Sequence, residues 1–472
     1  MIMMEMTIVL DHDSEEPLYL QLYQSIKKEI HAGKIETGVK LPSKRKLASH
    51  LHISQTTVET AYEQLLTEGY VESVPRKGIY VKEINSDLFS SVEKVVTTGR
   101  TQESESTDPY LVDFNHGKIA LEAFPYSIWR KLSIQSLYEE ESALFLNGER
   151  QGEAKLREEL AYYLYQSRGV RCTPEQIIIG AGTQYLICLL TMIIGRESVF
   201  SMENPGFHRT REAFKDQGVL VKPIPLDRDG INVKRLYESE ADVTYVTPSH
   251  QFPNGMVMPI HRRMELLQWA QEREGYIIED DYDGEFRYKG KPIPSLQGLD
   301  THGRVVYLGT FSKSLIPSVR ISYMVLPSTL LEKYNQHFNI YKQTVSRFHQ
   351  HTLEQFMKNG HWERHLNKMR TVYRKKQQVL IRSIETYLGN KVEVVGEDSG
   401  LHILLKVKHP SSERELIEQA AKVGVGVYPT SVYYEEANSI ENPMILLGFG
   451  GVSMKEIEKG IKLLGQAWFD DW

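Results

Sequence analysis

Residues 276–314 read YIIEDDYDGEFRYKGKPIPSLQGLDTHGRVVYLGTFSKS. Two short apolar runs in this stretch, Tyr276–Ile278 and Val305–Leu308, end abruptly in polar residues. Short apolar strands that alternate with helical segments are typical of an α/β domain with a mostly parallel sheet. Ligands of such sheets bind beyond the carboxyl ends of the strands, so the polar residues after each run are candidate ligand contacts.

The same pattern occurs twice earlier in the chain. Ile177–Ile179 precedes the glycine-rich stretch GAGTQ at 180–184, and Val243–Val246 precedes TPSHQFPNG at 247–255. From about Lys333 onward, a long helical stretch and mixed elements indicate a smaller C-terminal lobe. The sequence therefore predicts an α/β domain with a mostly parallel sheet, a ligand site at its carboxyl edge and a smaller C-terminal α+β lobe.

The composition is that of an ordinary globular protein with more than one domain. The chain has 472 residues, of which 41% are hydrophobic and 25% charged, with a net charge of −6. Its 2 cysteines exclude a disulfide scaffold and a cysteine-built zinc site, and we expect no metal site. No signal-peptide pattern opens the chain, and its longest apolar stretch is about half a membrane span. We therefore expect a cytoplasmic protein with no membrane segment.

One polar segment divides the chain. Asn85–Pro109 has few large apolar residues and contains the polar run Thr101–Asp108. This composition is typical of a linker that lets two domains move relative to each other. We place the first domain at 15–83, the linker at 84–112 and the second domain at 113–472.

The first domain has the pattern of three helices followed by a hairpin. Pro17 and Pro42 open the first two helices, and Ser54 caps the third. Two short strands, Tyr70–Ser73 and Ile79–Val81, enclose a turn with basic residues at its tip. Two helices joined by a tight turn and followed by such a hairpin predict a winged helix-turn-helix, whose recognition helix enters the major groove of DNA.

The residues that this plan places against DNA are either basic or short and hydrogen-bonding. The short polar residues suit base edges, and the cations suit phosphates or a guanine. These candidates are Arg45, Ser54, Gln55, Thr56, Thr57, Arg76 and Lys77. The alternative is that Ser54 and Thr57 only cap and solvate a surface helix.

The polar segments of the second domain offer the parts of a cofactor site. Lys313, in a tight turn after a strand, could form a Schiff base with an aldehyde, although a single lysine is more often a surface charge. Asp280 could pair with a pyridinium nitrogen; the alternative for its acidic cluster is a Mg²⁺ or Ca²⁺ site. The GAGTQ stretch at 180–184 and Arg320 could hold a phosphate, and Phe207 could stack on a ring. Together these residues predict a pyridoxal 5′-phosphate (PLP) site.

Both domains resemble known families. LPSKRKLASHLHISQTTVETAYEQLLTEGYVESVPRKGIYV, at 41–81, resembles the winged-helix domain of GntR-type bacterial transcription regulators. The motifs of the second domain, in their order and spacing, resemble fold-type I PLP-dependent aminotransferases. A fusion of the two is the layout of the MocR subfamily, which includes GabR-like and PdxR-like members. The resemblance implies double-stranded operator DNA as a partner and a head-to-tail homodimer.

The resemblance also assigns cofactor contacts by position. Lys313 would be the lysine that binds PLP covalently, Asp280 the partner of its ring nitrogen, and Tyr282 a neighbour of its phenolic oxygen. The full set of implied contacts is Lys313, Asp280, Tyr282, Arg320, Ser312, Thr310, Gly182, Thr183, Gln184, Phe207 and Asn254. Asn254, or Gln251 in its place, stands for an asparagine of the aminotransferases, because the loop that contains them differs from the family pattern.

One segment departs from the relatives that bind amino acids. Those relatives hold a substrate carboxylate with a late arginine in a G-F-A-R-like segment, whereas residues 448–451 read GFGG; His208 also stands where GabR-like members have arginine, although Arg209 follows. Glycine cannot form a bidentate pair with a carboxylate. We therefore expect a PLP-binding regulator in which PLP is also the effector, as in PdxR-like control of vitamin B6 synthesis, without physiological transaminase turnover.

Three alternatives stay open at this point. The effector could be an amino acid or amine that reacts with bound PLP, as in GabR-like members, if another arginine such as Arg347 reaches the pocket. The protein could be an active aminotransferase with an accessory DNA-binding domain. It could also use its aminotransferase-like domain as a dimerisation scaffold without cofactor, although Lys313, Asp280 and Arg320 argue against this.

Overall fold

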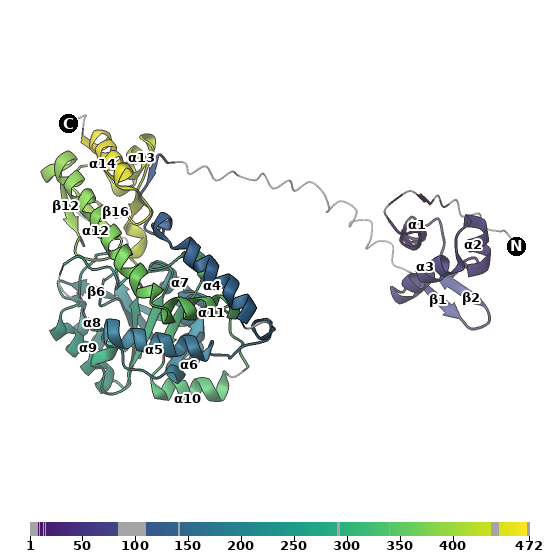
Figure 1. The fold of residues 1–472 in the computed structure, drawn as a ribbon, viewed down its shortest axis with the longest axis horizontal. Coiled ribbons are helices and arrows are strands. Elements are labelled where there is room, and N and C mark those ends of the chain that lie inside the picture. The colour runs from purple at the N-terminus through teal and green to yellow at the C-terminus, as the bar shows by residue number, and fades with distance from the viewer. Residues whose placement is uncertain are drawn as a thin grey trace. The chain divides into compact units, whose positions relative to one another are not determined.

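The chain folds into two compact units, Met1–Thr107 and Asp108–Trp472 (Figure 1). The computed structural model describes residues 8–83 except 9, 13 and 15, and residues 110–469 except 140–141, 290–292, 339 and 436–442. Most of the expected linker at 84–112 lies outside the described residues, so the three segment limits stay predictions. None of the helices in the described part of the chain is long and apolar enough to cross a membrane.

The first unit is a three-helix domain closed by a hairpin. Its elements are α1 (Leu18–His31), α2 (Lys44–Leu51), α3 (Gln55–Thr67), β1 (Val71–Val74) and β2 (Gly78–Val81). Ser43 and Ser54 cap α2 and α3, each accepting a hydrogen bond from a backbone N–H of the first turn. The two strands pair antiparallel, with Val71 opposite Val81. The predicted winged helix-turn-helix is confirmed.

The core of the first unit draws on every one of these elements. Its buried residues lie at helical spacing on the inner faces of the helices and on the inward side of the hairpin. They include Leu22, Ile26, Leu47, Val58, Tyr62, Leu65, Val71 and Val81. The opposite faces of α2 and α3 therefore stay exposed for contacts outside the domain.

The second unit is built around an eight-stranded sheet with strand order β4-β11-β10-β9-β8-β5-β6-β7. The strands are β4 (Ile177–Gly180), β5 (Phe200–Asn204), β6 (Val221–Asp227), β7 (Gly230–Ile231), β8 (Val243–Val246), β9 (Tyr276–Asp281), β10 (Val305–Thr310) and β11 (Ser322–Val325). Strands β6, β5, β8, β9 and β10 run parallel, and β11 runs antiparallel to β10 and β4. The predicted mostly parallel α/β sheet is confirmed.

Helices cover both faces of this sheet. They are α4 (Tyr126–Glu139), α5 (Ala154–Arg168), α6 (Thr183–Ile194), α7 (His208–Asp216), α8 (Val233–Glu238), α9 (Ile260–Glu272), α10 (Ser328–His337) and α11 (Arg347–Lys358). Within β4, Ile177 and Ile179 belong to a core with α5 and α11, whereas Ile178 belongs to a core with α6 and α10. Because both faces are buried, the strands are continuously apolar rather than alternating.

The long helix α12 (His361–Tyr387) leads from the large sheet into a smaller lobe (Figure 1). This lobe has an antiparallel sheet in the order β12-β13-β16-β15. Its elements are β12 (Val392–Val395), β13 (His402–Val407), α13 (Glu413–Lys422), β14 (Val425–Gly426), β15 (Tyr428–Pro429), β16 (Met444–Gly448) and α14 (Met454–Phe469). Strand β14 pairs with β3 (Val112–Asp113), which brings the start of the unit beside its C-terminal lobe.

Candidate functional site

A cavity of about 330 Å³ lies at the carboxyl ends of β9 and β10 and the start of α6. Ten of the eleven residues predicted to contact the cofactor line it: Gly182, Thr183, Gln184, Phe207, Asp280, Tyr282, Thr310, Ser312, Lys313 and Arg320. The structure does not bring Asn254 to the cavity lining. From the same loop, Phe252 lines the cavity instead, and Gln251 is buried with its amide donating to the Pro205 carbonyl at 2.9 Å.

Lys313 projects from the turn after β10 into the cavity. Its Nζ donates a hydrogen bond of 2.5 Å to the backbone carbonyl of His116. Burial lowers the pKa of the Lys313 amine to about 8, and the nearby Asp283 carboxylate opposes this by raising it. An amine with a lowered pKa is less protonated near neutral pH, which makes it a better nucleophile toward an aldehyde.

Asp280 lines the cavity with a buried carboxyl group. Its side chain accepts a hydrogen bond from the Tyr245 hydroxyl, and burial raises its pKa to about 7. Within the described residues no cation pairs with it. A ligand that carries a protonated ring nitrogen would supply the missing partner, because a buried carboxylate is stable only when it is paired or hydrogen-bonded.

The neighbouring carboxylates have other partners. Asp281 pairs with Arg168 at 2.6 Å, and Asp283 lies 3.0 Å from Nδ1 of His250. The three aspartates of the EDDYD segment are therefore directed to different groups and do not converge on one cation. Among the described residues, the cluster with metal-ligand spacing is His250, Asp283 and His402, which draws on three separate segments.

The start of α6 forms an anion-binding corner with Arg320. Gly182 caps the helix at a φ of +102°, and a Cβ there would collide with the Arg320 guanidinium. Among the described residues, Arg320 donates a single long hydrogen bond, 3.3 Å, to the carbonyl of Ala181. Free backbone N–H groups at a helix start, beside a guanidinium, bind phosphate. These residues fit the phosphate of PLP, as Lys313 and Asp280 fit its aldehyde and its ring nitrogen.

Aromatic side chains close one wall of the cavity. Phe207 stacks on Phe252 with ring centroids 4.1 Å apart, and it meets Tyr282 edge to face at 5.0 Å. The Tyr282 hydroxyl donates to the His250 carbonyl at 3.0 Å. Such a wall suits a flat ring, because aromatic rings gain most from stacked and edge-to-face contacts.

Several lining residues could not be found from sequence motifs. They are Asn115, His116, Gly117, Leu401, His402 and Tyr433, which come from distant parts of the chain. Burial and the Lys313 charge lower the pKa of His116 to about 4, so its ring is neutral at neutral pH. The pairing of β3 with β14 places Asn115, His116 and Gly117, and the antiparallel lobe supplies Leu401, His402 and Tyr433.

The GFGG segment packs against the loop that contains His116. A Cβ at Gly448 would collide with the His116 backbone, and one at Gly451 would collide with Lys118. Lys118 itself lies 2.9 Å from Asp113. The space beside the GFGG segment is therefore occupied by backbone and cannot accept a longer side chain without rearrangement.

The cations that line the cavity, among the described residues, are Arg209, Lys313 and Arg320. Arg347, a candidate for an arginine from elsewhere in the fold, does not line it. Its guanidinium instead pairs with Glu153, at 3.0 Å from Nε and 2.9 Å from a terminal nitrogen. Arg209 is exposed and forms no ion pair within the described residues.

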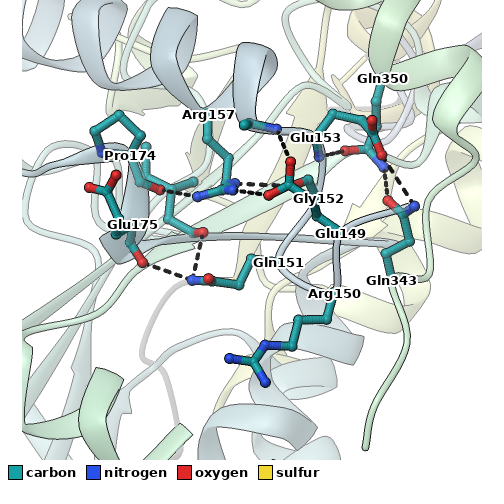
Figure 2. Close-up of polar contacts among 12 residues, drawn as sticks. Glu149, Arg150, Gln151, Gly152, Glu153, Arg157, Pro174, Glu175, Gln343 and Gln350 are labelled. Carbon is teal, nitrogen blue, oxygen red and sulfur yellow. Dashed lines mark hydrogen bonds and ion pairs between the residues drawn. The ribbon is translucent and has the colours of Figure 1, made fainter. Parts of the chain in front are cut away.

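Figure 2 shows the polar network that joins residues 149–157 to the segment just before β4. Arg157 donates to the carbonyls of Gly152 at 3.0 Å and Pro174 at 2.8 Å. The Gln151 carbonyl accepts a hydrogen bond of 2.8 Å from the Ile179 backbone N–H. The network thereby holds β4, whose end leads into the anion-binding corner.

Six of the seven predicted DNA contacts are exposed on the first unit, and Thr57 is half-buried. Ser54 and Thr57 are hydrogen-bonded to each other, with the Thr57 N–H donating to the Ser54 hydroxyl at 3.0 Å, so the predicted cap is present. Gln55 and Thr56 are exposed, and within the described residues their side chains form no hydrogen bond. Arg45, Arg76 and Lys77 are also exposed.

Both units match known families. Residues 18–81 match "Bacterial regulatory proteins, gntR family", and residues 112–455 match "Aminotransferase class I and II". A relative from Bacillus subtilis, the uncharacterized HTH-type transcriptional regulator YdeL, is 48% identical over 98% of this chain and 100% of its own. The probable rhizopine catabolism regulatory protein MocR of Rhizobium meliloti is 31% identical over 98% and 96%. The HTH-type pyridoxine biosynthesis transcriptional regulator PdxR of Corynebacterium glutamicum is 29% identical over 94% and 95%.

Solved structures resemble the second unit. The multiple substrate aminotransferase from Thermococcus profundus has a TM-score of 0.70 at 24% identity and covers 82% of this chain and 99% of its own. An archaeal alanine:glyoxylate aminotransferase has a TM-score of 0.69 at 26% identity and covers 76% and 91%. The fold-type I aminotransferase fold predicted from the sequence is confirmed.

Proposed function

Because the chain belongs to the MocR subfamily of GntR-type transcription regulators, we propose that it binds PLP and couples the occupancy of that site to operator binding. The observation that carries the proposal is one cavity that joins Lys313, Asp280 and the anion-binding corner at Arg320. DNA binding is assigned to residues 15–83, and cofactor binding to residues 113–472 beyond a linker at 84–112.

Each part of the cavity has a role toward the cofactor. When bound, PLP supplies an aldehyde that an amine can attack and a ring that accepts electrons. Lys313 would hold the aldehyde carbon, and Asp280 would keep the ring nitrogen protonated. The backbone N–H groups at the start of α6, with Arg320, would hold the phosphate, and Phe207 would pack on the ring.

We propose that PLP is also the effector, and that the protein regulates vitamin B6 synthesis. Two observations support this. The GFGG segment offers no arginine for a substrate carboxylate, and its glycines pack on the His116 loop. A relative with 29% identity is named as a pyridoxine biosynthesis regulator. Without a carboxylate anchor, amino acids would bind weakly, and physiological transaminase turnover would be absent.

A second candidate effector is an amine with a carboxylate group. The observation that favours it is Arg209, whose exposed guanidinium lines the cavity without an ion-pair partner among the described residues. A carboxylate bound there would form a charge-assisted pair. On this alternative, PLP would be permanently bound and the amine would be the signal.

Operator binding by PLP-free and PLP-loaded protein separates the two candidates. The duplex would first be selected from a random library by the full-length protein. PLP sensing predicts that affinity or the pattern of protected bases changes when PLP is added. Identical binding with and without PLP, followed by a change when an amino acid is added, would establish the amine as the effector.

We also propose that the protein is a head-to-tail homodimer. Supporting side chains are large, apolar and exposed on or next to α4: Tyr126, Ile134, Leu137, Tyr138, Phe145 and Leu146. A patch of this kind marks an interaction surface more often than a free one. Sedimentation of PLP-loaded protein as a monomer would contradict the proposal.

A further inference from the structure

One face of α12 is basic along its length. The helix contains seven lysines and arginines and two glutamates, in a chain whose net charge is −6. Five of its cations are exposed and lie on the face opposite the buried one, a set that we call the basic stripe: Arg364, Lys368, Arg374, Lys375 and Arg382. At 1.5 Å per residue, the stripe is about 27 Å long.

Within the described residues, no ion pair neutralises a cation of the basic stripe. Arg364 and Lys368 donate to backbone carbonyls, which leaves their charge in place. Within the part of the chain that the structure describes, Arg374, Lys375 and Arg382 have no ion-pair partner. Arg414 of α13, by contrast, pairs with Glu418 one turn later at 2.8 Å.

An uncompensated row of this kind costs stability. Arg364 and Lys368 are four residues apart, and like charges at this spacing repel each other on a helix surface. Arg374 and Lys375 add two adjacent cations. A polyanion laid along the helix would remove this repulsion and release counterions, so the stripe favours such a partner.

We propose that the basic stripe binds the phosphate backbone of the duplex that the winged helix-turn-helix reads, outside the bases that it contacts. This proposal rests on the DNA-binding function proposed above. Duplex DNA carries one charge per about 1.7 Å of axis, so a stripe of about 27 Å meets many phosphates. Contacts of this type add affinity that is independent of sequence and sensitive to salt.

The test compares salt titrations of DNA binding for full-length variants. One variant neutralises the three cations without ion-pair partners: Arg374→Gln, Lys375→Gln and Arg382→Gln. A matched control removes the same charge from α14, where exposed lysines alternate with Glu456 and Glu458: Lys455→Gln, Lys459→Gln and Lys462→Gln. Each is measured on the selected duplex and on the same duplex extended by about two helical turns at each end.

We expect the stripe variant to make the negative slope of log affinity against log salt shallower by up to about 2.7 on the extended duplex. The control should leave the slope unchanged, and discrimination between operators should be unchanged in both variants. An unchanged slope in the stripe variant, or an equal loss in the control, would overturn the proposal. An equal loss on the short and extended duplexes would overturn the placement outside the bases that are read.

A second variant adds charge and so does not depend on tolerance of the triple substitution. Thr371→Lys places a cation on the exposed face within the stripe, and we expect the slope to steepen by about 0.9. No steepening would count against the proposal. Arg76→Gln with Lys77→Gln tests the winged helix separately: if this variant bound DNA normally while the stripe variant did not, the domain assignment would fail and the stripe would stand.

Discussion

Lys313 and His116 are joined by a hydrogen bond of 2.5 Å from the lysine amine to the histidine backbone carbonyl. The two residues lie in distant segments, one after β10 and one just beyond β3. The same His116 backbone lies against Gly448, so one loop contacts both the lysine and the segment that lacks an arginine. A ligand that engages the Lys313 amine would compete with this bond, which couples the cavity to the start of the second unit.

We expect Lys313→Ala to abolish covalent attachment of PLP. No other lysine lines the cavity among the described residues, so no amine could replace it. The measurement is the borohydride-stable adduct, detected by mass spectrometry, with circular dichroism to show that the fold is retained. Lys289→Ala, an exposed lysine away from the cavity lining, is the control and should keep the adduct. An adduct in the Lys313 variant would place the attachment elsewhere.

The pH dependence of attachment should report the environment of Lys313. Its pKa is lowered to about 8, so the rate of PLP attachment to PLP-free protein should rise with pH and level off above that value. Asp283 raises this pKa, and Asp283→Asn should therefore move the midpoint of the profile to lower pH. Asp216→Asn, at the exposed end of α7, should leave the midpoint unchanged. A midpoint that rises in the Asp283 variant would contradict the assignment.

Asp280→Asn should weaken PLP binding while stabilising the PLP-free protein at alkaline pH. The loss of a charged hydrogen bond to the ring nitrogen predicts about a tenfold to hundredfold loss of affinity. Burial raises the pKa of Asp280 to about 7, so its contribution to stability is full at low pH and is lost as the pH rises through about 7. Asparagine does not ionise, so the variant does not lose this stability. The melting temperature of the PLP-free variant minus that of the unsubstituted PLP-free protein should therefore grow from pH 5 to pH 8. An equal difference at both pH values would contradict the assigned cause.

Most of the residues that sequence reasoning placed in the cavity follow a strand whose pattern is visible locally. Lys313, Asp280 and Gly182 lie at the ends of apolar runs, and parallel strands bring such ends to one edge. His116 and His402 follow no such rule, because they reach the cavity through the pairing of β3 with β14 and through the antiparallel lobe. Those contacts join distant segments, and β3 and β14, with two residues each, are too short to give a periodic signal.

In the loop at 247–255, too, the residue that lines the cavity has no local sequence signal. A family pattern with asparagine suggested Gln251 or Asn254, yet the side chain that lines the cavity is that of Phe252. Sequence order alone could not decide which of these neighbours faces the ligand, since the loop has no regular period. Gln251 uses its amide to hold Glu203 and the Pro205 carbonyl, which is a structural role for a polar residue at a site edge.

Substitutions at the adjacent residues Ser54 and Gln55 of the winged helix should have different effects, one on stability and the other on discrimination between operators. The Gln55 side chain is exposed and has no hydrogen bond within the described residues, so Gln55→Ala should leave stability unchanged and alter discrimination between operators by about 1–3 kcal/mol. The Ser54 hydroxyl accepts from the Thr57 N–H, so Ser54→Ala should lower the free energy of unfolding by about 1 kcal/mol. Urea unfolding and competition between operator variants measure the two effects. If Gln55→Ala weakened binding to every duplex equally, the residue would contact the backbone rather than a base edge, and the recognition surface would have to be assigned to other residues of α3.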